Sequence, residues 1–157
     1  MKILKAIIVF FRKILDFIFS FFNKESKKYP YVKKDFLLSK YELKFYNFLR
    51  KTLPPEYEIF CKVRVIDVIE PKYKKWHYWK NKIIQKHVDF VICKKPYMNI
   101  KLAIELNDSS HKFLERNVRD NFLNLAFNSA WLPILFFSPS ELKNPDYVFK
   151  LIISYLR

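Results

Sequence analysis

The sequence predicts an α/β domain in which helices flank a mixed β-sheet, in the order αβββαβα, behind an N-terminal amphipathic helix. Apolar runs of strand length alternate with stretches whose apolar residues recur at helical spacing. Apolar residues make up 51% of the 157-residue chain and aromatic residues 19%, which excludes a disordered chain and supports one domain with a real core. There is no glycine. Glycine-rich phosphate loops of the Walker and Rossmann types are therefore excluded.

The chain is strongly basic, with a net charge of +15 from 30 Lys and Arg residues against 15 Asp and Glu residues. Residues 1–34 hold nine basic and two acidic side chains, so this segment contributes +7 and the rest of the chain +8. Both parts favour polyanionic partners, either nucleic acid or anionic lipid. A general lysine bias is the alternative reading. Cys61 and Cys93 lie in apolar strand runs without a CxxC motif, which predicts reduced core thiols and a cytoplasmic location.

We expect three segments: an amphipathic helix over residues 1–23, a basic linker over 24–36 and a globular domain over 37–157. Within residues 3–22, Lys5, Arg12, Asp16 and Ser20 fall near one polar stripe of a helix whose other positions are Ile, Leu and Phe. This pattern favours a helix lying in a membrane interface, which would make the protein peripheral at the inner face of the membrane. Packing on the domain or on a second copy, and a true membrane span, are the alternatives.

The domain opens with a helix from Ser39 to Thr52, because Ser39 and Glu42 form a capping-box pattern and Pro54 follows the last apolar position. A strand is expected over residues 57–69. Asp67 lies late in that strand, where a structural role before the turn at Pro71 is favoured over a place in a functional site.

Residues 72–82, with the sequence KYKKWHYWKNK, interleave lysines with aromatic side chains. Aromatic rings stack on bases and lysines meet phosphates, so we expect nucleic-acid contacts from Lys74, Lys75, Trp76 and Trp79. An exposed hairpin loop, or an aromatic patch against a membrane, is the alternative.

Two acids interrupt the next two strands, which are expected over residues 83–93 and 100–106. Asp89 stands in the run HVDFVIC and Glu105 in the run LAIELN. A buried carboxylate is costly unless a cation pairs with it. We expect the two strands to be adjacent and antiparallel, joined by a turn over 94–99, so that both carboxylates reach one divalent cation, Mg²⁺ or Mn²⁺.

The remaining elements are a helix over residues 112–130, a buried strand over 131–137 and a last helix that restarts at Pro145. On the first of these helices, Arg116 and Arg119 lie four residues from Asp120 and Glu115 respectively, a spacing typical of surface ion pairs.

An Asp-bearing strand, a turn, a strand with Glu-x-Asn and then a helix resembles the PD-(D/E)xK nuclease superfamily. The longer pattern HVDFVI…AIELNDSSH…RD is similar to a bacterial family known as domain of unknown function 2726, which is related to very-short-patch-repair-type endonucleases. The resemblance covers residues 37–137. It implies a restriction-endonuclease-like fold and metal-dependent hydrolysis of nucleic acid, with DNA favoured over RNA, and it names no substrate.

The resemblance also implies residue roles. Asp89 and Glu105 would hold the metal, and Glu42 would complete the site. Asn107 stands where the superfamily usually has Lys, so Lys86 or His111 would replace that cation. Further residues implied near the substrate or His111 are Asp120, Lys112, Arg116 and Arg119. Two alternatives remain: a nuclease fold that binds nucleic acid without cutting it, and a membrane-associated scaffold that binds anionic lipid.

Overall fold

The computed structural model of the chain describes residues 10–19, 29–72, 75–107 and 113–156, without the side chains of 113–118. The chain divides into two compact units, Met1–Leu37 and Leu38–Arg157. In the first unit, residues 10–19 form a helix with every residue exposed, and residues 29–37 are exposed and irregular. Among the described helices, none has the length and apolar character needed to cross a membrane.

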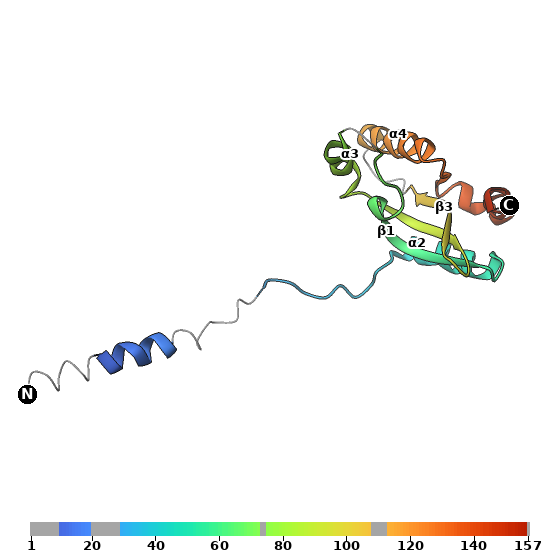
Figure 1. The fold of residues 1–157 in the computed structure, drawn as a ribbon. Coiled ribbons are helices and arrows are strands. Elements are labelled where there is room, and N and C mark those ends of the chain that lie inside the picture. The colour runs from blue at the N-terminus through green and yellow to red at the C-terminus, as the bar shows by residue number, and fades with distance from the viewer. Residues whose placement is uncertain (1–9, 20–28, 73–74, 108–112, 157) are drawn as a thin grey trace, which may run out of the picture. The chain divides into compact units, whose positions relative to one another are not determined.

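The second unit is a mixed α/β domain built on a four-stranded mixed sheet of order β1-β2-β3-β4 (Figure 1). The β1–β2 and β2–β3 pairs are antiparallel and the β3–β4 pair is parallel. Its helices and strands are α2 (Lys40–Thr52), β1 (Tyr57–Arg64), α3 (Trp76–Ile83), β2 (His87–Lys94), β3 (Asn99–Leu106), α4 (Phe113–Ser129), β4 (Ile134–Phe137) and α5 (Pro145–Leu156), and its 3-10 turns are Val65–Asp67 and Glu141–Lys143.

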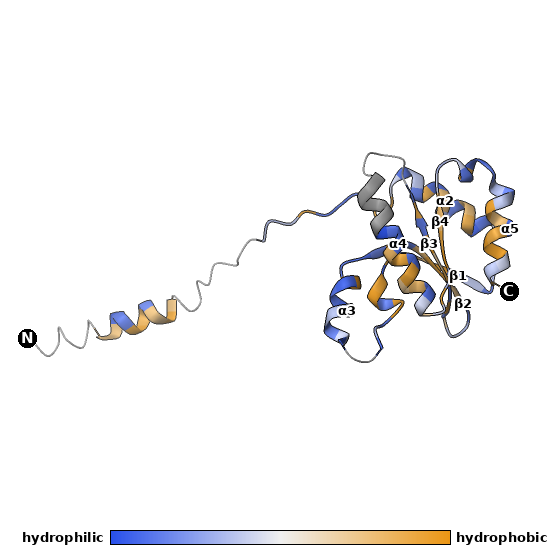
Figure 2. Cartoon of the chain, turned by 90° about the horizontal axis from the view of Figure 1, so that it is seen from above, coloured by the Kyte–Doolittle hydropathy of each residue, from blue (hydrophilic) through white to orange (hydrophobic). Residues whose placement is uncertain are grey.

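Helices cover both faces of the sheet, as the sequence predicts. Figure 2 shows α3 and α4 on one side of the strands and α2 and α5 on the other. One core joins α2 and α5 to β2 and β3 through residues such as Leu49, Phe90 and Ile104. The second core joins α3 and α4 to the opposite face, where Val91 and Phe127 are buried. The period-two alternation of β2 and β3 therefore fixes which side chains face which helical layer.

The hairpin that carries both acids is confirmed. β2 and β3 pair in antiparallel register from Phe90 opposite Ile104 to Lys94 opposite Asn99. The capping box of α2 is also confirmed, because the Ser39 N–H donates to Glu42 Oε2 at 2.7 Å and the Glu42 N–H donates to Ser39 Oγ at 3.3 Å. The helix ends at Thr52 as expected.

The structure corrects three expected strands, and the observed order is αβαββαβα. The first strand ends at Arg64 and not at Ile69, because a 3-10 turn follows and Asp67 forms a surface ion pair with Arg64 at 2.8 Å. The second begins at His87 and not at Ile83. Ile83 is instead the buried end of α3, whose Trp76, Trp79 and Ile83 have helical spacing. The last of the three begins at Ile134 and not at Trp131, which is exposed.

A chain that starts at Tyr31 should stay folded, because both hydrophobic cores consist of residues from Leu38 onward. We expect cooperative thermal melting within about 3 °C of the full chain, together with higher solubility. Circular dichroism melting of both forms measures this. If the shortened chain lost cooperative melting, the N-terminal segment would be part of the core.

Candidate functional site

Asp89 and Glu105 lie side by side where the pairing of β2 with β3 ends. The Asp89 N–H donates to Glu105 Oε2 at 3.3 Å, and the Leu106 N–H donates to Asp89 Oδ2 at 2.9 Å. The two carboxylates thus accept backbone donors just beyond the Phe90–Ile104 pair. Both residues are buried, with only 9% of Asp89 and 6% of Glu105 exposed. The acids converge, as the antiparallel hairpin predicts.

The other oxygen of each carboxylate meets a cationic side chain. Asp89 Oδ1 accepts from Lys62 Nζ at 2.8 Å, and Glu105 Oε1 accepts a short hydrogen bond from Arg119 Nη2. The acids are buried, whereas the Lys62 and Arg119 side chains remain 32% and 43% exposed. The cations therefore lie between the buried carboxylates and solvent.

Lys62 reaches Asp89 because the pairing of β1 with β2 brings these two residues opposite each other. Cys61 pairs with Phe90 and Val63 pairs with Val88 without a register shift, so that residues 62 and 89 lie between these two pairs. The φ of Lys62 is 55°, a left-handed conformation that costs a non-glycine residue about 1 kcal/mol or more. Sequence reasoning missed Lys62. The only signal was a charged residue inside an apolar strand run.

Glu42 is both the cap of a helix and a partner of Lys62 in the acid cluster. Its Oε2 caps α2, while its Oε1 accepts from Lys62 Nζ. Burial acts to raise the pKa of Glu42, but hydrogen bonds from Lys62 and Ser39 outweigh it and lower the pKa. Burial acts to lower the pKa of Lys62, but its bonds to Asp89 and Glu42 raise it. Lys62 is therefore a firmly charged link between α2 and the sheet.

Burial and the neighbouring charge of Asp89 raise the pKa of Glu105 from its ordinary 4.5 to about 7, against the opposing effect of Arg119. The charge of Asp120 acts in the same direction as that of Asp89. Within the described part of the chain, Glu42, Asp89 and Glu105 form ion pairs with two cations, Lys62 and Arg119, and Asp120 accepts from the neutral Asn107. Among the described side chains, this cluster therefore holds more acids than cations, although the protein as a whole is strongly basic.

The other predicted site residues divide into three groups. Asn107 Nδ2 donates to Asp120 Oδ2 at 3.2 Å, so these two residues pair beside Glu105. The expectation for Lys86 is corrected, since its Nζ lies 5.5 Å above the Phe122 ring and Lys62 takes the position beside the carboxylates. Lys74, His111, Lys112 and the Arg116 side chain lie outside the described residues.

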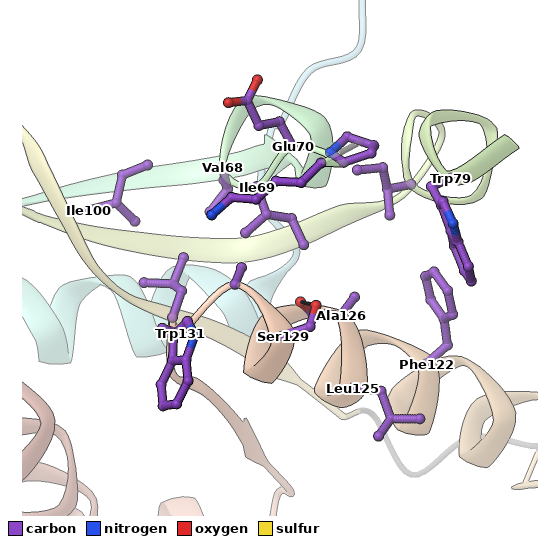
Figure 3. Close-up of a pocket in the computed structure, with 15 residues that line it drawn as sticks. Val68, Ile69, Glu70, Trp79, Ile100, Phe122, Leu125, Ala126, Ser129 and Trp131 are labelled. Carbon is purple, nitrogen blue, oxygen red and sulfur yellow. Dashed lines mark hydrogen bonds between the residues drawn. The ribbon is translucent and has the colours of Figure 1, made fainter. Parts of the chain in front are cut away.

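The basic aromatic stretch forms α3, and not the hairpin loop considered as an alternative. Lys75 directly precedes α3, and Lys80 Nζ lies 4.5 Å above the Trp76 ring. Trp79 lines a cavity of about 940 Å³ between α3, α4 and the segment after β1. Figure 3 shows Trp79 and Phe122 pointing toward one another at one end of this cavity. Phe122 lies three residues beyond Arg119, so α4 connects the cavity to the acid cluster.

The donor set suits a hard divalent cation, because Asp89 and Glu105 offer carboxylate oxygens, the ligands that Mg²⁺ prefers. The described residues contain no cluster of three or more His, Cys, Asp and Glu side chains arranged for a metal. Asp108 and His111, which follow β3 in the sequence, lie outside the described residues.

Replacing Lys62 with Met should destabilise the protein, because Asp89 and Glu42 lose their shared cation. Since the Lys62 side chain is a third exposed, we expect a loss of about 1–3 kcal/mol in the free energy of unfolding. Urea denaturation at pH 7 measures this. Lys44→Met, which changes an exposed lysine of α2, is the control and should be neutral. Equal stability of both variants would show that the Lys62 ion pairs contribute nothing.

Glu105 should make stability fall as the pH rises. The folded protein holds this proton more tightly than the unfolded chain, so its stabilisation is complete below pH 4.5 and is lost through about pH 7. Wild type and Glu105→Gln should therefore match near pH 5. By pH 8 the wild type should be less stable by roughly 2–3 kcal/mol. Urea denaturation across this range measures the difference, and a difference that does not change with pH would contradict the raised pKa.

Comparison with known proteins confirms the resemblance to domain of unknown function 2726. The profile of a family described as Protein of unknown function (DUF2726) matches residues 34–154, which include every residue of the acid cluster. No curated protein and no solved structure matches the chain. The family match spans most of the chain, and the protein belongs to the DUF2726 family.

Proposed function

We propose that this protein is a metal-dependent nuclease of restriction-endonuclease-like fold that hydrolyses phosphodiester bonds of nucleic acid, with Mg²⁺ or Mn²⁺ held by Asp89 and Glu105. One observation carries the proposal. Two buried carboxylates lie side by side, and each turns one oxygen to the backbone and the other to a partly exposed cation. The raised pKa of Glu105 supports it, because burial and the neighbouring charge of Asp89 disfavour the ionised form of Glu105, which a bound cation would stabilise.

A divalent cation at this site, when bound, lowers the pKa of a coordinated water and offsets the charge of the phosphate. The protein's own residues supply the rest. Asp89 and Glu105 are fixed by the Leu106 and Asp89 N–H groups, so little reorganisation is needed to present their outer oxygens. Arg119 is partly exposed beside Glu105 and can pair with a phosphate oxygen.

Lys62 is the residue we assign to the cationic role that the superfamily usually gives to the position of Asn107. Its Nζ lies 2.8 Å from Asp89 Oδ1, and its side chain is accessible to solvent. Glu42 provides a second contact that keeps the ammonium group in place. Asn107 itself pairs with Asp120 and carries no charge. In this assignment Glu42 positions Lys62, and it is not a metal ligand.

The substrate would reach the acids along α3 and α4. Residues 35–157 carry a net charge of +8, which favours a polyanion. Trp76 and Trp79 offer rings for base stacking, with Lys75 and Lys80 beside them for phosphates. Because Arg119 and Phe122 share α4, a strand bound at Trp79 would lie within a helical turn of the acid cluster.

The second candidate is a nuclease-fold protein that binds nucleic acid without cutting it. Asn107 favours this reading, because an amide that donates to Asp120 can neither activate water nor neutralise charge. The two candidates share the binding surface and differ in whether metal leads to cleavage.

Glu105→Gln should abolish metal-dependent cleavage, because it removes a charged ligand with almost no change in volume. We expect a loss of more than about 100-fold on single- or double-stranded DNA with Mg²⁺ or Mn²⁺. The control is Glu58→Gln, which changes a half-exposed glutamate near Lys95 and should keep full activity. Calorimetric titration with Mn²⁺ gives a second readout, in which only Glu105→Gln should lose binding.

The outcomes separate the two candidates. If metal binding depends on Glu105 but no strand is cleaved, the protein binds nucleic acid without cutting it, and the nuclease candidate is excluded. If cleavage or Mn²⁺ binding persists in Glu105→Gln, Asp89 and Glu105 do not form the metal site. Both substitutions break an ion pair, that of Glu105 with Arg119 and that of Asp89 with Lys62. Asp89→Asn is the weaker probe, because the raised pKa of Glu105 means that the Arg119 pair does not outweigh its burial, whereas loss of the Lys62 pair is expected to lower stability.

A further inference from the structure

The described N-terminal helix separates its charged and apolar side chains cleanly. At about 100° per residue, Arg12, Lys13 and Asp16 fall within roughly a quarter to a third of the helix circumference. The rest of the surface carries large apolar side chains, and Figure 2 shows the hydrophobic and hydrophilic sides of this helix. Those apolar residues include Phe10, Phe11, Ile14, Leu15, Ile18 and Phe19, all of them exposed.

The width of this apolar surface argues against a partner helix. A coiled-coil seam needs only two apolar positions in seven. Here the apolar side chains cover well over half of the circumference, and several of them are phenylalanines. That distribution suits insertion into a fluid apolar layer with the polar side at the surface.

The charge around the helix indicates that the apolar layer is a membrane with an anionic surface. Residues 1–34 carry nine basic side chains against two acidic ones, and Lys33 and Lys34 are exposed in the irregular segment that leads to the domain. Basic residues beside an inserted helix contribute about 1 kcal/mol each near an anionic membrane surface. Apolar insertion and charge attraction are the two signals that together give stable anchoring.

We propose that residues 10–19 attach the protein to an anionic lipid surface, with the Phe11 and Ile18 side of the helix inserted and Arg12 and Lys13 at the headgroup phosphates. The attachment is independent of the acid cluster and goes beyond the nuclease proposal. It would hold the enzyme or binding domain next to a membrane through the basic segment that joins the helix to the domain.

Flotation of the full chain with vesicles of phosphatidylcholine and phosphatidylglycerol tests the proposal. The double variant Phe11→Ser with Ile18→Ser should lower the partition coefficient by roughly 100-fold. Its control, Leu43→Ser with Tyr97→Ser, removes two exposed apolar side chains of the domain and should bind as wild type. Equal binding by the variant and the control would overturn the proposal.

A second pair of variants tests the charge component. Arg12→Gln with Lys13→Gln should lower binding to the anionic vesicles by roughly 10- to 30-fold, and binding should weaken with salt. Its control, Lys143→Gln with Lys150→Gln in the domain, should have little effect. If this control lost as much binding, the general charge of the domain, and not the helix, would hold the protein on lipid.

Sedimentation of the full chain without lipid tests whether a second copy of the chain packs on the apolar side of the helix. The proposal expects the same mass for wild type and for the Phe11→Ser, Ile18→Ser variant. An oligomer that the wild type forms and the variant does not form would show that a second copy covers this surface, and it would overturn the proposal. DNA binding measured on the same variants should be unchanged, which separates the membrane role from the proposed nuclease site.

Discussion

Two backbone N–H groups at the end of the β2–β3 ladder are bound by carboxylates and not by carbonyls. The Leu106 N–H donates to Asp89, and the Asp89 N–H donates to Glu105. This exchange lets the two strands part without leaving unsatisfied donors, which would be costly in the interior. It also fixes two acids inside the protein, and every further feature of the site responds to their charge. The other oxygen of each acid must meet a cation, and Lys62 and Arg119 meet that need from opposite directions.

The same cations connect the site to the layers of the domain. Lys62 ties β1 to α2 through Glu42, and Arg119 ties α4 to β3. The acid cluster is therefore supported from both helical layers, which is the arrangement that keeps functional groups in place. The left-handed backbone at Lys62 is part of this support. The register of β1 with β2 places residue 62 opposite Asp89, between the Phe90 and Val88 pairs, and the left-handed φ of 55° occurs at this one residue of β1.

The sequence predicts the two buried acids but not the cations that pair with them, and the reason is physical. Asp89 and Glu105 stand out because a charge in an apolar strand needs an explanation, and the antiparallel hairpin follows from the short turn between the runs. Lys62 gives a weaker signal, because it shares the alternate positions of its strand with Glu58 and Arg64 and therefore looks like part of a polar strand face. Lys86 is the nearer lysine along the chain, but it precedes β2 and lies over Phe122. The sequence does not predict the helix α3, because its buried Ile83 is equally compatible with the start of a strand.

The two contacts of Lys62 also bear on how the cluster could work. If Asp89 gave its outer oxygen to a divalent cation, Lys62 would lose one of its two partners and would be repelled by the metal. Glu42 holds the ammonium group through a separate oxygen, and the capping box fixes that glutamate at the first turn of α2. Lys62 can therefore stay beside the acids when Asp89 is occupied. A single salt bridge would not keep it there, and this explains why a helix cap and a strained strand residue meet at one point of the domain.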